Sequence, residues 1–329
     1  MVGVRVTPDC DSINSIYISS ANDVQMMPEV AFGNDNYMVV WSDARIGDRI
    51  NIYGARVTPD GTVLDPDGIL IGPGTETLEF EPSIAFTGTR FFVVWLNYSS
   101  QFGVAGRFVN CDGTLGDTVR IANTTNEGNR TSVAYDGTNF LVVWTQYIYF
   151  LMGQFVSGNG NLIGSPFTIA TGVELSSSGN LSFDGNCYTV VYTIRNGNNY
   201  EVWGRQYDTS GNPLGPAFII SDPVNSSYDP HIVAGATNYL NVWTHMEYPS
   251  DIYGNTDMLI GIDADDLQVK AKARELITTI IRGPLVFPGE EKYQVFDITG
   301  RQVDINRMSP GIYFIQADGE IVQKVVKIR

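Results

Sequence analysis

Tyr37-Met38-Val39-Val40-Trp41 is the stretch that decides the fold, because four related copies of it follow along the chain. The copies are Phe91-Phe92-Val93-Val94-Trp95, Phe140-Leu141-Val142-Val143-Trp144, Tyr188-Thr189-Val190-Val191-Tyr192 and Tyr239-Leu240-Asn241-Val242-Trp243. Their closing aromatic residues are 54, 49, 48 and 51 residues apart. A period of roughly fifty residues, filled with short β-rich runs and turn residues, is typical of a β-propeller with one four-stranded blade per repeat.

The rest of each repeat fits the same unit. A short apolar strand and a Gly/Asn/Asp turn precede the V-V-W strand, and a third strand that contains a glycine follows it. We predict that the closing aromatics pack between blades, although a stacking platform for sugars is the functional alternative. The residues predicted to have structural roles in the repeat are Trp41, Trp95, Trp144, Tyr192, Trp243, Gly54, Gly106, Gly153 and Gly204.

The N-terminus matches the second half of a repeat, since Val2-Gly3-Val4-Arg5-Val6 resembles Tyr53-Gly54-Ala55-Arg56-Val57. The last repeat supplies a first half, so joining the two would close a ring without an open edge. We therefore predict an all-β protein with a five-bladed β-propeller over residues 1–266. It comprises a half-blade, 1–20, and blade units 27–73, 80–122, 130–170, 178–221 and 228–262.

One segment leaves the closure open. Ile252-Tyr253-Gly254-Asn255 also resembles a third strand, so the last blade has a local candidate as well as an N-terminal one. If the local strand is used, residues 1–20 are free to pair with a neighbouring molecule. Pairing within one ring and pairing between molecules both stay open at this point.

The charge changes sharply near the end of the repeats. Residues 1–266 contain 10 Arg and 29 acidic residues, a net charge of −19, whereas residues 267–329 carry +3 and all five lysines. Such a shift in composition indicates a domain boundary. We predict a separate small β-sandwich of immunoglobulin-like form over residues 267–329.

The repeats resemble those of bacterial secreted and surface propeller proteins, whose units read A-[FY]-D-G-x-N-[FY]-x-V-V-W. The C-terminal segments resemble the type A C-terminal sorting domain of type IX secretion: Tyr293-Gln294-Val295-Phe296-Asp297-Ile298-Thr299-Gly300-Arg301, Ser309-Pro310-Gly311-Ile312-Tyr313-Phe314-Ile315 and Lys324-Val325-Val326-Lys327-Ile328-Arg329. The resemblance implies export and an extracellular or cell-surface location. The Pro-Asn-Pro start of such domains is absent.

Composition excludes several classes of function. The net charge of −16 would repel a phosphate backbone, so nucleic acid is not an expected partner. No apolar run approaches the ~18 residues of a membrane span. Three cysteines, Cys10, Cys111 and Cys187, form neither an even framework nor a CxxC pair, so no disulfide scaffold or zinc site is predicted, and their redox state stays open.

No catalytic or cofactor-binding residue can be selected from the sequence. His231 and His245 lack an accompanying nucleophile or acid motif and are interpreted as structural, and no G-x-S-x-G, H-E-x-x-H or phosphate loop is present. We predict no cofactor. Calcium is the weak alternative, with Asp263, Asp265 and Asp266 as candidate ligands that fit a solvated linker better.

These observations lead to one main prediction and two alternatives. The main prediction is a non-enzymatic extracellular protein with a structural or adhesive role, self-assembly into a fibre by strand donation being one form of it. The expected partners are further copies of the chain and surface glycans or proteins. The first alternative is a lectin-like propeller that binds glycans or proteins. The second is a carbohydrate-active enzyme, because glycosidases need only two well-placed carboxyl groups, which sequence cannot locate among 36 acidic residues.

Overall fold

The computed structural model describes most of the chain, and the described residues divide into two compact units, Met1–Gly261 and Ile262–Arg329. The described part contains strands and turns but no helix, and so no helix able to cross a membrane. Residues not described are 7–11, 48, 75–77, 99–102, 124–129, 147–148, 173–178, 222–225, 236–237, 246–250, 256–276, 282–292, 298–300, 305–307, 310, 318–319 and 328–329.

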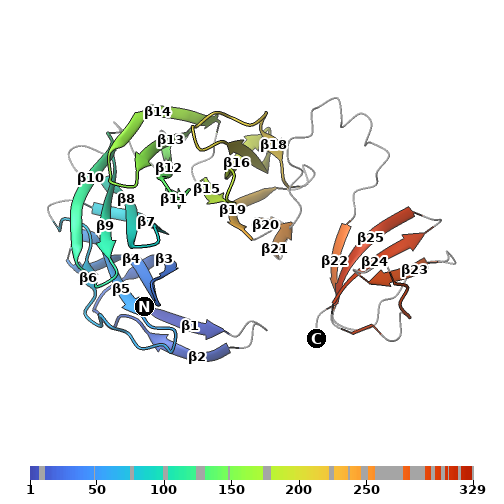
Figure 1. Cartoon of the computed structure of the whole chain (residues 1–329), viewed down its shortest axis with the longest axis horizontal. Helices are drawn as coiled ribbons and strands as arrows, with labels where there is room; N and C mark the ends of the chain where they lie inside the picture. The colour runs from blue at the N-terminus through green and yellow to red at the C-terminus, as the bar shows by residue number, and fades with distance from the viewer. Residues whose placement is uncertain are drawn as a thin grey trace. The chain divides into compact units, whose positions relative to one another are not determined.

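The first unit is a five-bladed β-propeller, as the repeats predict (Figure 1). Each of the first four blades is a four-stranded antiparallel sheet. Blade 1 contains β3 (Gln25–Gly33), β4 (Asn36–Ile46), β5 (Arg49–Val57) and β6 (Ile69–Leu70). Blade 2 contains β7 (Leu78–Phe86), β8 (Arg90–Tyr98), β9 (Gly103–Asn110) and β10 (Leu115–Asn123).

Blades 3 and 4 repeat this order, and blade 5 has three described strands. Blade 3 contains β11 (Thr131–Tyr135), β12 (Asn139–Gln146), β13 (Phe150–Ser157) and β14 (Leu162–Thr171). Blade 4 contains β15 (Asn180–Phe183), β16 (Tyr188–Asn196), β17 (Asn199–Tyr207) and β18 (Phe218–Ile219). Blade 5 contains β19 (Ser227–Ala234), β20 (Tyr239–His245) and β21 (Asp251–Asn255).

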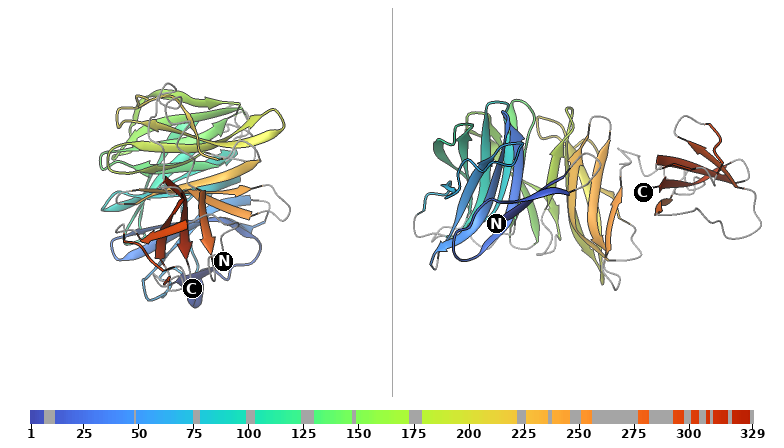
Figure 2. Two further views of the ribbon diagram at one scale, coloured as in Figure 1. Left: turned by 90° about the vertical axis from the view of Figure 1, so that its right-hand side faces the viewer. Right: turned by 90° about the horizontal axis from the view of Figure 1, so that it is seen from below.

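The blades stack face against face (Figure 2), and side chains of the V-V-W strands belong to the buried clusters that lie between them. Trp41, Trp95 and Trp144 are among the largest fully buried side chains, and Tyr192 and Trp243 are also buried. The repeated glycines lie where a side chain would collide with the neighbouring strand. A Cβ atom at Gly54 would lie 2.7 Å from Ile71 Cδ1, and the same crowding occurs at Gly106, Gly153 and Gly204.

The N-terminal half-blade does not complete blade 5, contrary to our expectation of closure. Its strands β1 (Val2–Val6) and β2 (Ser12–Tyr17) pair with each other as a two-stranded sheet, and the local strand β21 pairs with β20 instead. Ile18 packs on the face of blade 1 that carries Trp41 and Tyr53. Strand β21 follows β20 after a short connection in the sequence. Pairing β20 with β21 therefore costs less chain entropy than pairing it with the distant β1.

The inner strands of successive blades, β3, β7, β11, β15 and β19, contact one another in that order, but β19 and β3 share no contact of comparable extent. The faces of blades 1 and 5 that turn toward each other are therefore uncovered among the described residues. We call the space between these two faces the 1–5 seam. Both of its walls line the central channel.

The described residues of the second unit form a single four-stranded sheet in the order β22-β25-β24-β23, with β22 and β25 parallel. A second layer, which the predicted immunoglobulin-like sandwich requires, is not shown. The strands are β22 (Ile277–Ile281), β23 (Tyr293–Asp297), β24 (Gly311–Ala317) and β25 (Glu320–Lys327).

Candidate functional site

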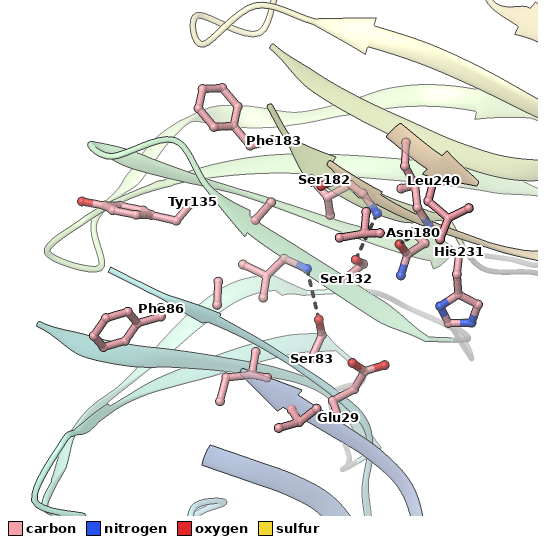
Figure 3. Close-up of a pocket in the computed structure, with 18 of the residues that line it drawn as sticks. Glu29, Ser83, Phe86, Ser132, Tyr135, Asn180, Ser182, Phe183, His231 and Leu240 are labelled. Carbon is pink, nitrogen blue, oxygen red and sulfur yellow. Dashed lines mark hydrogen bonds between the residues drawn. The ribbon is translucent and has the colours of Figure 1, made fainter. Parts of the chain in front are cut away.

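The inner strands of the five blades line a central channel that encloses a cavity of about 530 Å³ (Figure 3). One register position recurs in each inner strand, opposite the second valine of each motif. Its side chain differs from blade to blade, and the five residues are Glu29, Ser83, Ser132, Asn180 and His231. The same position of the repeat thus contributes a side chain to the channel in every blade, and these side chains are a carboxyl group, two hydroxyl groups, an amide and an imidazole.

Three of these five side chains connect neighbouring blades. The Val133 N–H donates to Ser83 Oγ at 3.2 Å, and the Leu181 N–H donates to Ser132 Oγ at 3.2 Å. Asn180 Oδ1 accepts from the backbone N–H of the next inner strand, at Ile232, at 3.1 Å. Glu29 and His231 belong to the two blades that border the 1–5 seam, so their side chains remain available to the channel.

A second set of residues surrounds the mouth of the channel, two positions before the first set. Met27, Glu81, Arg130 and Asp229 all have positive φ angles, from 45° to 56°. Three of these lie at register shifts of their inner strands, which are β-bulges. Bulges and left-handed backbone at non-glycine residues cost free energy and concentrate at functional sites, where they redirect a side chain.

Charged groups from three blades meet at this mouth. Arg130 Nε lies 3.6 Å from Glu81 Oε2, and Arg130 Nη1 lies 3.7 Å from Asp229 Oδ1. Thr131 Oγ1 donates to the Glu81 carbonyl oxygen at 2.7 Å, which ties blade 3 to the bulge of blade 2. These residues adjoin a smaller cavity of about 190 Å³, which Glu29 and His231 also line.

The environment of the mouth changes the protonation of its carboxyl groups. Burial raises the pKa of Glu29; the nearby Arg130 guanidinium opposes the rise, and Glu81 adds to it. Glu29 is exposed to the channel, yet protein surrounds its carboxyl closely enough to weaken hydration. Burial likewise raises the pKa of Glu81, with Arg130 opposing and Asp229 contributing. Two carboxyl groups with raised pKa values therefore face one small cavity.

His231 has a depressed pKa, because burial and the Arg130 charge both disfavour its imidazolium form, while Asp229 partly offsets them. The neutral imidazole form of His231 is therefore favoured. Figure 3 shows His231 and Glu29 at the same end of the channel. Phe86, Tyr135 and Phe183 lie at the other end, which gives the channel a charged end and an aromatic end.

The sequence did not lead us to this site. Of the residues it singled out, His231 lies at the mouth rather than in a purely structural position, and the His245 side chain is outside the described residues. Asp263, Asp265, Asp266 and Cys10 are also outside them. Within the described ranges no group of three His, Cys, Asp or Glu residues is arranged to hold a metal ion. A usable signal did exist, namely a proline directly after each of the three bulged residues, at Pro28, Pro82 and Pro230.

No family model matches the chain, and no curated protein is similar to it in sequence. Several solved propeller structures are similar in fold. An arabinanase from Bacillus subtilis is 13% identical, with 72% of this chain and 95% of that chain covered and a TM-score of 0.44. An endo-arabinase from Bacteroides thetaiotaomicron is 13% identical, with 72% and 94% covered and a TM-score of 0.47. The catalytic domain of a Coprinopsis cinerea α-L-arabinofuranosidase is 10% identical, with 74% and 87% covered and a TM-score of 0.45.

Our main prediction of a non-enzymatic structural or adhesive protein is corrected by these findings. The three solved structures named above are an arabinanase, an endo-arabinase and an arabinofuranosidase, and these findings contradict both the predicted class and the predicted absence of enzymatic activity. Likeness at 10–13% identity establishes the fold alone. What this chain does must follow from its own channel.

Proposed function

We propose that the propeller is a carbohydrate-active enzyme that hydrolyses glycosidic bonds at the charged mouth of its channel. The observation that carries the proposal is the pair of glutamates with raised pKa values, Glu29 and Glu81, facing one cavity beside Arg130. Glycoside hydrolysis requires a carboxylic acid to protonate the leaving oxygen and a second carboxyl group as base or nucleophile. A raised pKa favours the protonated form that the acid needs.

The contacts of the two glutamates suggest different roles for them. Arg130 contacts Glu81 directly, which favours its carboxylate form, so Glu81 is the candidate base or nucleophile. Glu29 has no ion pair of this kind within the described residues, and it is the candidate proton donor. Arg130 lies between Glu81 and Asp229 and orients the carboxyl groups of these two residues.

A neutral glycan fits the channel better than a charged substrate does. The propeller segment, residues 1–266, carries a net charge of −19, which repels anions. The wall contains hydroxyl and amide groups for hydrogen bonding, and aromatic rings at its far end suit stacking on sugar faces. No nucleophile motif of another hydrolase class occurs in the sequence, so two carboxyl groups are the simplest available catalytic set.

Release of reducing sugar from a panel of neutral polysaccharides, including an arabinan, tests the proposal. We expect wild-type turnover on at least one, and a loss of about 10²–10⁴-fold in kcat for Glu29→Gln and for Glu81→Gln. Asp112→Asn, at an exposed turn acid, is the matched control and should keep full activity. Binding of a glycan without turnover would contradict the enzyme and support the lectin-like alternative.

We further propose that the second unit serves export to the cell exterior. The support is the sorting-domain motif in β23, β24 and the basic end of the chain. A fusion of residues 267–329 to a reporter should be secreted by a bacterium with type IX secretion, and a fusion that lacks Lys324–Arg329 should not. Secretion of both fusions alike would contradict this role. The predicted second layer of the unit belongs to the same proposal.

A further inference from the structure

The walls of the 1–5 seam expose positions that the other seams bury. On blade 1, Val30 is 57% exposed, whereas its equivalents Ile84, Val133, Leu181 and Ile232 are 6–9% exposed. On blade 5, Leu240 is 44% exposed, whereas Met38, Phe92, Leu141 and Thr189 at the equivalent position are fully buried. Because the repeat is otherwise the same, each wall has the surface of an inter-blade contact without its partner.

The outer part of blade 1 is already covered by β1 and β2. Arg5 Nη1 donates to the Asp60 carbonyl oxygen at 2.6 Å, and Arg56 Nη1 donates to the Cys111 carbonyl oxygen at 3.3 Å, each 55 residues further along the chain. The half-blade therefore rests on blade 1 in the way that the outer half of blade 1 rests on blade 2. The half-blade consists of the two outer strands of a blade, and the two inner strands that would complete it are not paired with it.

Strand β1 lacks the neighbour that its equivalents have. In blade 1, β5 pairs with β4 on one side and with β6 on the other, whereas β1 pairs with β2 alone. Val2, Val4 and Val6 are 54–61% exposed, while their counterparts in β5, at Tyr53, Ala55 and Val57, are at most 7% exposed. In a complete blade, β20 would pair with the free edge of β1, and blade 4 would cover its exposed face.

Strand β21 occupies the place that β1 would take beside β20. Gly254 lies opposite Val242, as Gly54 lies opposite Val40 in blade 1, and Gly3 is the matching glycine of β1. The tyrosine and glycine of β21 follow the pattern of β5, yet no fourth strand pairs with β21 within the described residues. Strands β1 and β21 both have the sequence pattern of the third strand of a blade. They therefore compete for the same edge of β20.

We propose that the hairpin β19–β20 exchanges between these two partners. In the state described here it pairs with β21 and leaves the 1–5 seam open. In the second state it releases β21, seats on the exposed face of blade 1 and pairs with β1, with Val242 opposite Gly3. The occupant of the exposed face is the chain's own hairpin, because both uncovered walls belong to one compact unit and each supplies the apolar surface that the other lacks.

Closing the seam also changes the candidate catalytic site. Glu29 and His231 stand on the two strands that meet when β19 seats beside β3, so closure completes the ring of five side chains around the channel. This consequence rests on the proposed glycosidase function, whereas the strand exchange itself does not. The open state admits substrate through the seam, and the closed state confines it.

Three engineered cysteine pairs at one register position test the exchange. Val4→Cys with Asn241→Cys reports the closed state, and Asn241→Cys with Asn255→Cys reports the open state. Val39→Cys with Ala55→Cys is the matched control, because these residues are partners in a complete blade. Each pair is made in the full-length chain with Cys10, Cys111 and Cys187 replaced by serine, oxidised, and separated on a non-reducing gel. Circular dichroism of each reduced variant confirms that it folds.

We expect both seam pairs to form an intramolecular disulfide, each to at least half the extent of the control. Formation of the Asn241–Asn255 disulfide alone would overturn the exchange. A Val4–Asn241 disulfide that joins two chains would overturn it as well, because a second copy would then be the occupant. These results do not depend on turnover, so failure of the glycosidase proposal and failure of the exchange are distinguishable.

Discussion

Two kinds of seam hold or border the blades of this propeller. In the seams between blades 1 and 2, 2 and 3, and 3 and 4, aromatic and aliphatic residues of the V-V-W strands form continuous buried clusters. In the 1–5 seam, Leu240 of the last V-V-W strand and Val30 of the inner strand β3 face solvent, whereas their equivalents in the other blades are buried. The same repeat therefore forms a core where a neighbour is present and an accessible wall where it is not. Glu29 and His231 lie on the two strands that border this seam. The titratable side chains of the repeated channel position are therefore found at the uncovered seam.

The largest expected difference between the seams is in side-chain truncation. Phe91→Ala, in the seam between blades 1 and 2, removes a ring that is 1% exposed and should lower the free energy of unfolding by about 3–5 kcal/mol. Tyr37→Ala, at the equivalent position in the 1–5 seam, should cost about 1 kcal/mol, because solvent already reaches the ring. Urea unfolding measures both. Equal losses would show that the 1–5 seam is as packed as the others in solution.

A pH-dependent difference should come next in size. Glu79 lies fully buried at the seam between blades 1 and 2, accepts a hydrogen bond from the Ile52 N–H, and has a pKa raised by burial to about 7. Between pH 4.5, its ordinary pKa, and pH 7, the folded protein retains a proton that the unfolded chain releases, so stability falls as pH rises.

Glu79→Gln should remove this dependence, because the side chain no longer titrates. We expect the variant to be more stable than wild type above pH 7 by up to about 3 kcal/mol, and equal to it below pH 4.5. Thermal unfolding from pH 4 to pH 8 measures the difference. Parallel pH profiles for the two proteins would refute the assignment.

The hydrogen bonds between inner strands should have a smaller effect. Ser132→Ala removes the acceptor of the Leu181 N–H and should cost about 1–2 kcal/mol, since a buried donor is left without its partner. Glu29→Gln, at the same register position beside the 1–5 seam, should leave stability within about 0.5 kcal/mol or raise it slightly. A loss for Glu29→Gln as large as that for Ser132→Ala would assign a structural role to Glu29.

The smallest effect should be at the exposed wall itself. Val30→Thr changes an apolar group that is already in contact with water, so its cost should stay below about 0.5 kcal/mol. Val133→Thr, at the buried equivalent, should cost at least 1 kcal/mol, because it buries a hydroxyl group. A clear loss for Val30→Thr would indicate that the closed state of the seam dominates.

The fold was predictable because its determinants repeat. The V-V-W strands and the glycines at Gly54 and Gly106 recur with the same residue types, so the sequence alone predicted the five blades. The catalytic candidates were not predictable, since the bulge position changes from Met27 to Glu81 to Asp229 and its function depends on which blades are neighbours. The closure could not be decided from the sequence, because β1 and β21 carry the same pattern and sequence does not say which one β20 selects.

The pH–rate profile of polysaccharide hydrolysis tests the central claim most directly. If Glu29 donates the proton and Glu81 acts as the base, the wild-type profile is bell-shaped, because Glu29 must be protonated and Glu81 ionised. The account predicts that Glu29→Gln lowers kcat by about 10²-fold or more and removes the alkaline limb of the profile. A Glu29→Gln enzyme with wild-type kcat and an unchanged alkaline limb would contradict it.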